Sequence, residues 1–320
     1  MIYVGTPLGE RAQNELTQAL GAERVTFGAM PRDDEPLESW PSALRECEVL
    51  VTWGSRVTPT LIQRLANLRW IHSVSAGVDT VPFRLLRERH ISLSNSRGMH
   101  GRPMAEQILG TMIAYSRGLY VFWQNQREQR WERGYPVDEL TGKTLCIVGA
   151  GSIGQEVARK ARAFDMRVIG VRTRPEMKPD FDAMYAMDDL NQALAEADFV
   201  VVLTPLTPKT HHLIGSPQFA SMKPTAILLN YARGPVVDEA ALIEALKARR
   251  IRGAGLDVFD REPLPPDHPL WTLDGVLITP HTGGWSPHHD EREVALFLAN
   301  WSAYQRGEPL PNAVDLDRQY

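Results

Sequence analysis

Near the start of the chain, short apolar runs alternate with segments in which apolar residues recur at helical spacing. The apolar runs cover residues 2–4, 49–53 and 70–73, and the helical segments cover residues 11–20, 60–65 and 83–87. Strands separated by helices build βαβ units, whose strands lie parallel in one sheet. The pattern therefore predicts an α/β domain in this part of the chain.

A long helical segment separates this region from a second one. Residues 104–118 carry apolar side chains at helical spacing, and the polar residues 124–138 are expected to form a surface connection. Further apolar runs then predict strands at residues 144–148, 168–171, 199–203, 226–230, 253–258 and 276–279, and residues 290–304 are helical again. The chain thus contains a second α/β domain.

Composition agrees with a globular protein of two domains. Of the residues, 43% are apolar and 23% are charged, which is typical of a globular protein. A single hydrophobic core rarely serves a chain of 320 residues, so we expect two domains. The formal charge of −4 gives no general attraction for nucleic acid or anionic lipid. No apolar run approaches the roughly 18 residues of a membrane span, and the first residues lack the pattern of an export leader. We expect neither nucleic-acid nor membrane binding.

The cysteines and histidines narrow the setting further. Cys47 and Cys146 are the two cysteines, and each lies in an apolar run typical of a buried strand. Buried, reduced cysteines suit the cytoplasm. The chain has no CxxC or HxxxH spacing, and the adjacent histidines at 211–212 and 288–289 project in different directions, so we expect no metal site.

A glycine-rich turn follows the first strand of the second domain. Residues 149–154 read Gly-Ala-Gly-Ser-Ile-Gly, and they run directly into a helical pattern. In such a turn the first glycine permits the tight bend, the second lets a pyrophosphate approach the backbone, and the third allows the helix to pack on the strand. The helix N-terminus adds free N–H groups and partial positive charge. A glycine-rich turn without a ligand is the alternative to the predicted dinucleotide site at Gly149, Gly151, Ser152, Ile153 and Gly154.

The end of the next strand indicates which dinucleotide binds. NAD sites place an acidic residue there to accept hydrogen bonds from the ribose hydroxyls. This chain instead has Arg172, Thr173 and Arg174. Guanidinium groups bind phosphate through paired, charge-assisted hydrogen bonds, so the sequence favours NADP, whose ribose carries an extra phosphate. NAD bound without an acidic partner, beside a solvated arginine loop, remains the alternative.

Polar residues follow three later strands, at the sheet edge where doubly wound folds build their sites. Reduction of a 2-keto acid requires a cation for the substrate carboxylate and a proton donor for the carbonyl oxygen. Arg233 and His281 fit these two roles, and Glu262 is the carboxylate expected to favour the protonated imidazole. Each residue also has a purely structural interpretation. Arg233 could cap a helix, Glu262 could be a solvated loop acid, and His281 could be a buried structural histidine.

Four ordered motifs resemble those of the D-isomer-specific 2-hydroxyacid dehydrogenase family, which includes glyoxylate/hydroxypyruvate reductases. They are residues 204–210 (TPLTPKT), 230–239 (NYARGPVVDE), 255–263 and 280–283, and they follow the GAGSIG turn in the family's order. The resemblance implies that Arg233 binds substrate, that Glu262 pairs with His281, and that His281 is the acid/base. It also implies cofactor contacts from Thr204, Pro205, Thr210, Ala232 and Asp257, the last two with the nicotinamide carboxamide.

The resemblance extends to the first domain. Ser75, Ala76 and Gly77 match the family loop whose backbone N–H groups receive the substrate carboxylate. The implied fold has two doubly wound parallel sheets, with a Rossmann cofactor domain (residues 100–289) inserted in a flavodoxin-like substrate domain (residues 1–99 and 290–320) that closes over the substrate. The helix from residue 104 resembles the family's dimer-forming element, which predicts a homodimer, although its apolar face is equally suited to a core.

Other functions stay open at this point. D-3-phosphoglycerate dehydrogenase is less favoured, because residues 52–54 supply no cation for a second anionic group. A dinucleotide-sensing binding protein could keep the same residues without turnover. Formate oxidation fits poorly, because that reaction does not need the Glu262–His281 pair. Trp285 either narrows the substrate pocket or packs at a dimer contact.

Overall fold

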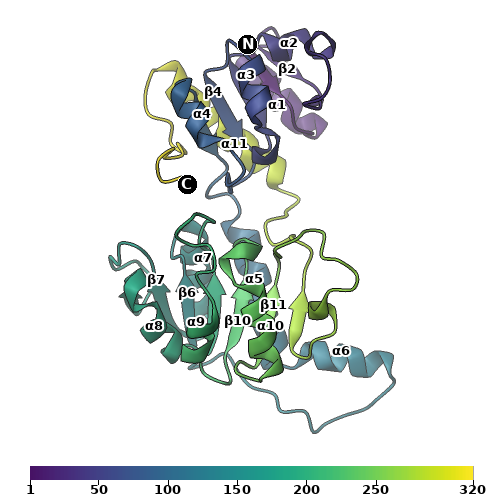
Figure 1. Ribbon diagram of the computed structural model, residues 1–320, viewed down its shortest axis with the longest axis vertical. Coiled ribbons are helices and arrows are strands. Elements are labelled where there is room, and N and C mark those ends of the chain that lie inside the picture. The colour runs from purple at the N-terminus through teal and green to yellow at the C-terminus, as the bar shows by residue number, and fades with distance from the viewer. Residues whose placement is uncertain (320) are drawn as a thin grey trace. The chain divides into compact units, whose positions relative to one another are not determined.

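The computed structural model describes residues 1–319, which form two compact units (Figure 1). Unit 1 comprises Met1–Met99 and Ser286–Tyr320, and unit 2 comprises His100–Trp285. Every strand pair in both sheets is parallel. The predicted fold class, two parallel-sheet α/β domains, is confirmed. Within residues 1–319, no helix combines the length and apolarity that crossing a membrane requires.

Unit 1 contains a five-stranded sheet in the order β2-β1-β3-β4-β5. This is the flavodoxin-like order. Its strands are β1 (Ile2–Val4), β2 (Val25–Phe27), β3 (Val49–Thr52), β4 (Trp70–Ser73) and β5 (Ser92–Asn95). Its α-helices are α1 (Glu10–Leu20), α2 (Ser42–Arg45), α3 (Pro59–Arg64), α4 (Phe83–Glu88) and α11 (His289–Gln305). Separate apolar clusters cover the two faces of the sheet, and the face that packs against α1 also receives Val294 and Phe297 of α11.

Unit 2 contains a seven-stranded sheet in the order β12-β11-β10-β9-β6-β7-β8. Its strands are β6 (Thr144–Val148), β7 (Arg167–Val171), β8 (Ala183–Tyr185), β9 (Phe199–Val202), β10 (Ile227–Asn230), β11 (Gly253–Leu256) and β12 (Val276–Ile278). Its α-helices are α5 (Gly101–Ser116), α6 (Leu119–Arg127), α7 (Ser152–Arg162), α8 (Leu190–Glu196), α9 (Ser216–Ser221) and α10 (Glu239–Lys247). The strand order reverses at β6, and ligands of such sheets bind at the carboxyl ends beside that point.

Three elements differ from the sequence-based expectation. The stretch expected to be a surface connection from residue 124 lies partly in helix α6, which projects from the body of unit 2 (Figure 1). The short edge strands β2 and β8 were not anticipated. Both are three residues long and partly exposed, so their apolar pattern is weak.

Candidate active site

The glycine turn after β6 has the shape of a phosphate cradle. Gly149 has φ +100°, and a Cβ there would lie 2.7 Å from the backbone of Leu203 and Thr204. A Cβ on Gly154 would meet Ile147 Cγ2 at 2.9 Å, so this glycine allows α7 to pack on β6. A Cβ on Gly151 would meet nothing within 4 Å, which leaves open space at the start of α7 for an anion. These features fit the pyrophosphate of a dinucleotide.

The segment after β9 lies against this turn. Thr204 is 6% exposed, and its Oγ1 is buried without a hydrogen-bond partner in the described chain. A buried hydroxyl without a partner is rare, and its place beside the glycine turn fits a contact with the predicted cofactor. Thr210 has a different role, because its Oγ1 donates to Pro205 O at 2.6 Å and accepts from Thr207 N at 2.8 Å. Thr210 therefore shapes the loop that carries Thr204 and Pro205.

Two guanidinium groups follow β7. Arg172 is half-buried, whereas Thr173 and Arg174 are exposed. Within residues 1–319, neither arginine forms an ion pair with a carboxylate. Both are thus available to an anionic ligand at the position where a cofactor ribose would lie.

Three loops converge at the carboxyl ends of β10, β11 and β12. A Cβ on Gly234 would lie within 2.0–2.4 Å of the Phe259 and Asp260 backbone, so the Arg233 loop packs directly on the loop that leads to Glu262. A Cβ on Gly283 would lie 3.1 Å from Tyr231 Cδ1. The His281 loop therefore packs on the same segment that leads to Arg233.

Glu262 and His281 form a close, partly accessible pair. His281 Nδ1 lies 2.7 Å from Glu262 Oε2, and the side chains are 45% and 35% exposed for histidine and glutamate, respectively. The other carboxylate oxygen, Oε1, accepts from Phe259 N at 3.0 Å, which fixes the orientation of Glu262. Because Nδ1 is engaged, Nε2 is the ring nitrogen left to exchange a proton with a substrate.

Asp257 holds the loop that carries His281. Its carboxylate accepts from Thr282 N at 3.1 Å and Gly283 N at 2.9 Å, and its backbone oxygen accepts from His281 N at 2.8 Å. His281 has φ +53°, a left-handed conformation that non-glycine residues rarely adopt, and these bonds maintain it. Asp257 is 2% exposed, so its main contacts are with the protein's own loop.

Two residues of α5, close to Asp257 and Tyr231, were missed by sequence reasoning. Gln107 of α5 donates to Asp257 Oδ1 at 3.1 Å and to Thr279 Oγ1 at 2.9 Å, and Thr111 Oγ1 lies 2.8 Å from the Tyr231 hydroxyl. Burial raises the pKa of the Tyr231 phenol. Polar residues within the apolar stripe of α5 were the available signal, since such positions usually bind a buried polar partner.

The remaining predicted residues lie as follows. Arg233 follows Ala232 after β10, and its Nη1 donates to Ala232 O at 2.8 Å. Asp260, which was not among the predicted residues, lies between Asp257 and Glu262, and its pKa is raised by burial and further by the Glu239 carboxylate. Trp285 is 74% exposed at the end of the His281 loop.

Ser75, Ala76 and Gly77 lie in unit 1, in the loop after β4. We call residues 75–78 the carboxylate loop. Within residues 1–319, the N–H groups of Ala76, Gly77 and Val78 have no hydrogen-bond partner. Gly54 lies beside this loop, because a Cβ there would meet Ser75 Oγ at 3.1 Å and Gly77 O at 3.3 Å. Adjacent unpaired N–H groups form a receptor for an anion.

Comparisons with known proteins agree with this geometry. Residues 109–283 match the family model described as D-isomer specific 2-hydroxyacid dehydrogenase, NAD binding domain. Glyoxylate/hydroxypyruvate reductase B of Pectobacterium carotovorum is 37% identical over 87% of this chain and 90% of its own length. D-3-phosphoglycerate dehydrogenase of Methanocaldococcus jannaschii is 36% identical over 98% of this chain, which spans 59% of that protein's length. The structure of a D-isomer specific 2-hydroxyacid dehydrogenase from Xanthobacter autotrophicus with NADPH and MES is 28% identical, with a TM-score of 0.85 and coverage of 100% of this chain and 99% of that one.

Proposed function

We propose a specific reaction for this chain, which belongs to the D-isomer specific 2-hydroxyacid dehydrogenase family and is an NAD(P)-dependent oxidoreductase. It reduces small 2-keto acids such as glyoxylate or hydroxypyruvate with NADPH. The reaction is reversible and runs in the other direction as oxidation of a D-2-hydroxy acid. The observation that carries the proposal is the 2.7 Å contact between Glu262 and His281. Asp257 holds the His281 loop in place, and all three residues lie in the unit that contains the phosphate cradle.

In this proposal His281 is the proton donor. A reduced nicotinamide cofactor held by the glycine turn after β6 would supply the hydride for the carbonyl carbon of the substrate. His281 Nε2 gives a proton to the carbonyl oxygen, which becomes the hydroxyl of the product. Glu262 orients the ring through its contact with Nδ1. Glu262 thus positions the ring, and His281 transfers the proton from its other nitrogen.

We assign the substrate carboxylate to cationic and N–H donors. Arg233 follows β10 next to the loops of Glu262 and His281, where a guanidinium binds a carboxylate and polarises the adjacent carbonyl. In unit 1, we assign the unpaired N–H groups of the carboxylate loop to the same substrate group. Unit 1 is accordingly the proposed substrate domain, and unit 2 the proposed cofactor domain.

A direct assay tests the proposal. The purified protein is mixed with NADPH and each of glyoxylate, hydroxypyruvate and 3-phosphohydroxypyruvate, and the absorbance of NADPH is followed. We expect turnover of the two unphosphorylated acids. A preference for 3-phosphohydroxypyruvate would favour a phosphoglycerate dehydrogenase, and NADPH binding without turnover of any acid would favour a dinucleotide-sensing protein.

The preference for NADP is assigned to Arg172, supported by Arg174. Replacing Arg172 with alanine removes a guanidinium that has no carboxylate partner within residues 1–319. We expect the KM for NADPH to rise about tenfold while the KM for NADH changes little, since a charge-assisted contact to phosphate contributes about 1.5–3 kcal/mol. Equal changes in both KM values would contradict the assignment.

We propose a cytoplasmic homodimer. The apolar face of α5, the helix predicted to form the dimer contact, packs in the core of unit 2, so we place the contact at α6 and the loop after it. Trp123 is 59% exposed and Trp131 is 87% exposed, and exposed aromatic side chains of this size favour an interaction site. The cytoplasm suits the buried free thiols of Cys47 and Cys146, and burial raises the pKa of each thiol to about 12. Sedimentation of the wild-type protein and of a Trp123→Ala/Trp131→Ala variant tests the assembly, which should dissociate in the variant.

A further inference from the structure

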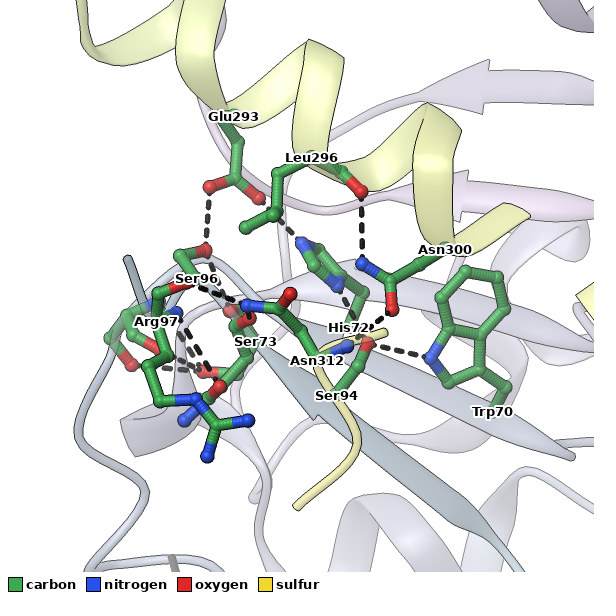
Figure 2. Close-up of polar contacts among 12 residues, drawn as sticks. Trp70, His72, Ser73, Ser94, Ser96, Arg97, Glu293, Leu296, Asn300 and Asn312 are labelled. Carbon is green, nitrogen blue, oxygen red and sulfur yellow. Dashed lines mark hydrogen bonds and ion pairs between the residues drawn. The ribbon is translucent and has the colours of Figure 1, made fainter. Parts of the chain in front are cut away.

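Unit 1 contains a buried polar network that the proposed reaction does not use (Figure 2). His72 of β4 is fully buried, and Glu293 of α11 is 2% exposed. The His72 Nε2 lies 2.8 Å from Glu293 Oε1, and Nδ1 lies 2.7 Å from Ser94 Oγ. Trp70 Nε1 donates to the same serine oxygen at 2.8 Å. At this depth each group depends on its partner, because no water replaces a lost contact.

Ser96 connects this network to the carboxylate loop. Its hydroxyl donates to Glu293 Oε2 at 2.6 Å and also lies 3.0 Å from the Ser73 backbone oxygen. Its backbone N–H donates to Ser75 O at 3.3 Å. Figure 2 shows Glu293 above Ser96 and Ser73, with His72 alongside. One serine therefore joins the last helix of the chain to the start of the loop.

The backbone oxygens of Ser75, Ala76 and Gly77 in the carboxylate loop all accept hydrogen bonds inside unit 1. Besides the Ser75 oxygen, Ala76 O accepts from Asn95 Nδ2 at 2.6 Å, and Gly77 O accepts from Ser75 Oγ at 2.8 Å. In a trans peptide the C=O of one residue and the N–H of the next point in opposite directions. Fixing these three oxygens inward consequently turns the N–H groups of residues 76–78 away from the network.

We propose that Glu293 is a positioning residue that fixes the direction of these N–H groups through Ser96. The inference rests on the proposed function in one respect, namely that the N–H groups receive the substrate carboxylate. Without the Glu293 carboxylate, Ser96 Oγ and His72 Nε2 each lose a buried partner, and residues 73–77 regain freedom. Substrate binding weakens, whereas the phosphate cradle of unit 2 is unaffected.

Three variants separate positioning from general stability. Glu293→Ala should raise the KM for glyoxylate about tenfold or more, because small misplacements of binding groups have effects up to about a hundredfold. Glu293→Gln should stay within about threefold of the wild type, because its amide oxygen accepts from His72 and its NH₂ donates to Ser96, whose hydroxyl then reaches Ser73 O. Tyr304→Phe is the matched control, since it removes another α11 contact, the 2.7 Å bond to Glu48, away from the loop.

The kinetic experiment measures three quantities for each variant, namely the KM for glyoxylate, the kcat and the affinity for NADPH. The change in KM is then compared with the changes in the other two. We expect Glu293→Ala to change the KM with NADPH affinity preserved, and Tyr304→Phe to change neither. A Glu293→Ala protein with wild-type KM, an equal loss of NADPH affinity, or a Glu293→Gln protein as impaired as Glu293→Ala would each overturn the proposal. If Glu293→Ala does not fold, Ser96→Ala replaces it, with the same expected rise in KM.

A second readout does not depend on the reaction. Hydrogen exchange of peptides that cover residues 92–98 reports on the Ser96 N–H, which is bonded to Ser75 O. Exchange there should be faster in Glu293→Ala than in the wild type and unchanged in Tyr304→Phe. Unchanged exchange in Glu293→Ala overturns the inference even if the enzyme is active. Absence of turnover in the wild type instead contradicts the proposed function and leaves the exchange result to decide the positioning role.

Discussion

The two units each contain a histidine–glutamate pair of nearly the same length in very different surroundings. His281 and Glu262 of unit 2 are 2.7 Å apart, with side chains 45% and 35% exposed. His72 and Glu293 of unit 1 are 2.8 Å apart, with side chains 0% and 3% exposed. The same two functional groups are thus accessible to a ligand in one unit and sealed from it in the other.

The difference shows that two properties decide the role of such a pair. They are its accessibility to a ligand and whether a ring nitrogen of the histidine is left without a hydrogen bond. His281 uses Nδ1 for its contact with Glu262, so Nε2 remains for the proposed substrate. His72 has both ring nitrogens engaged, by Ser94 and Glu293, so it has nothing left to offer a reactant. We therefore expect the unit 2 pair to affect turnover and the unit 1 pair to affect stability and geometry.

The largest expected effect comes from His281→Ala. Loss of a general acid lowers kcat by about 10²–10⁴-fold. The free energy of unfolding should change by less than about 1 kcal/mol, because the pair is exposed. Single-turnover kinetics and NADPH titration check the result together. A variant that loses cofactor affinity as strongly as it loses turnover would contradict the assigned role.

Glu293→Ala should have the largest effect on stability. Removing one partner from a buried pair lowers the free energy of unfolding by about 3 kcal/mol. The corresponding change in unit 2, Glu262→Ala, should lower it by less than about 1 kcal/mol. Urea denaturation of both variants gives the two values. Similar losses for both would remove the distinction between the pairs.

Glu262→Gln should have an intermediate effect on turnover. The amide keeps the shape of the carboxylate, but its hydrogen bond to Nδ1 is no longer charge-assisted, so the ring is oriented less firmly and kcat falls about 10–100-fold. Steady-state kinetics with glyoxylate and NADPH measure the loss. A kcat within about twofold of the wild type would exclude a role for the Glu262 charge.

A third pair gives the smallest expected effect. His288 and Glu291 at the start of α11 are 3.5 Å apart and 63% and 67% exposed. Glu291→Ala should change the free energy of unfolding by less than about 0.5 kcal/mol and leave turnover unchanged, because exposed ion pairs contribute little. The same denaturation and assay experiments apply, and a larger change would show that burial is not what orders the three pairs.

The sequence predicted the parts of the molecule that local pattern determines. The strand from Thr144 and the turn at Gly149 follow from apolar spacing and from glycine chemistry, and both appear in the structure. The strands β2 and β8 and the helix α6 were not predicted. The first two are short edges, and α6 is mostly only partly buried, with Trp123 exposed, so none of the three has a clear buried face.

The candidate site was predictable only in its separate segments. Motif order placed Glu262 and His281 after successive strands, but the bonds from Asp257 to the His281 loop depend on tertiary packing. The buried network was missed for the same reason, because Glu293 lies 221 positions from His72. A glutamate within the apolar stripe of α11, next to Val294, was the only local sign.

The division of unit 1 between two distant stretches of chain has a consequence for biosynthesis. Unit 2 is continuous, so a ribosome completes it while the opening sheet still lacks α11. Until α11 and the segment after it are synthesised, His72 has no carboxylate opposite it, and the Asn95 backbone N–H lacks the Asn312 oxygen to which it donates. The strands of unit 1 are therefore synthesised well before the helix that completes their interior.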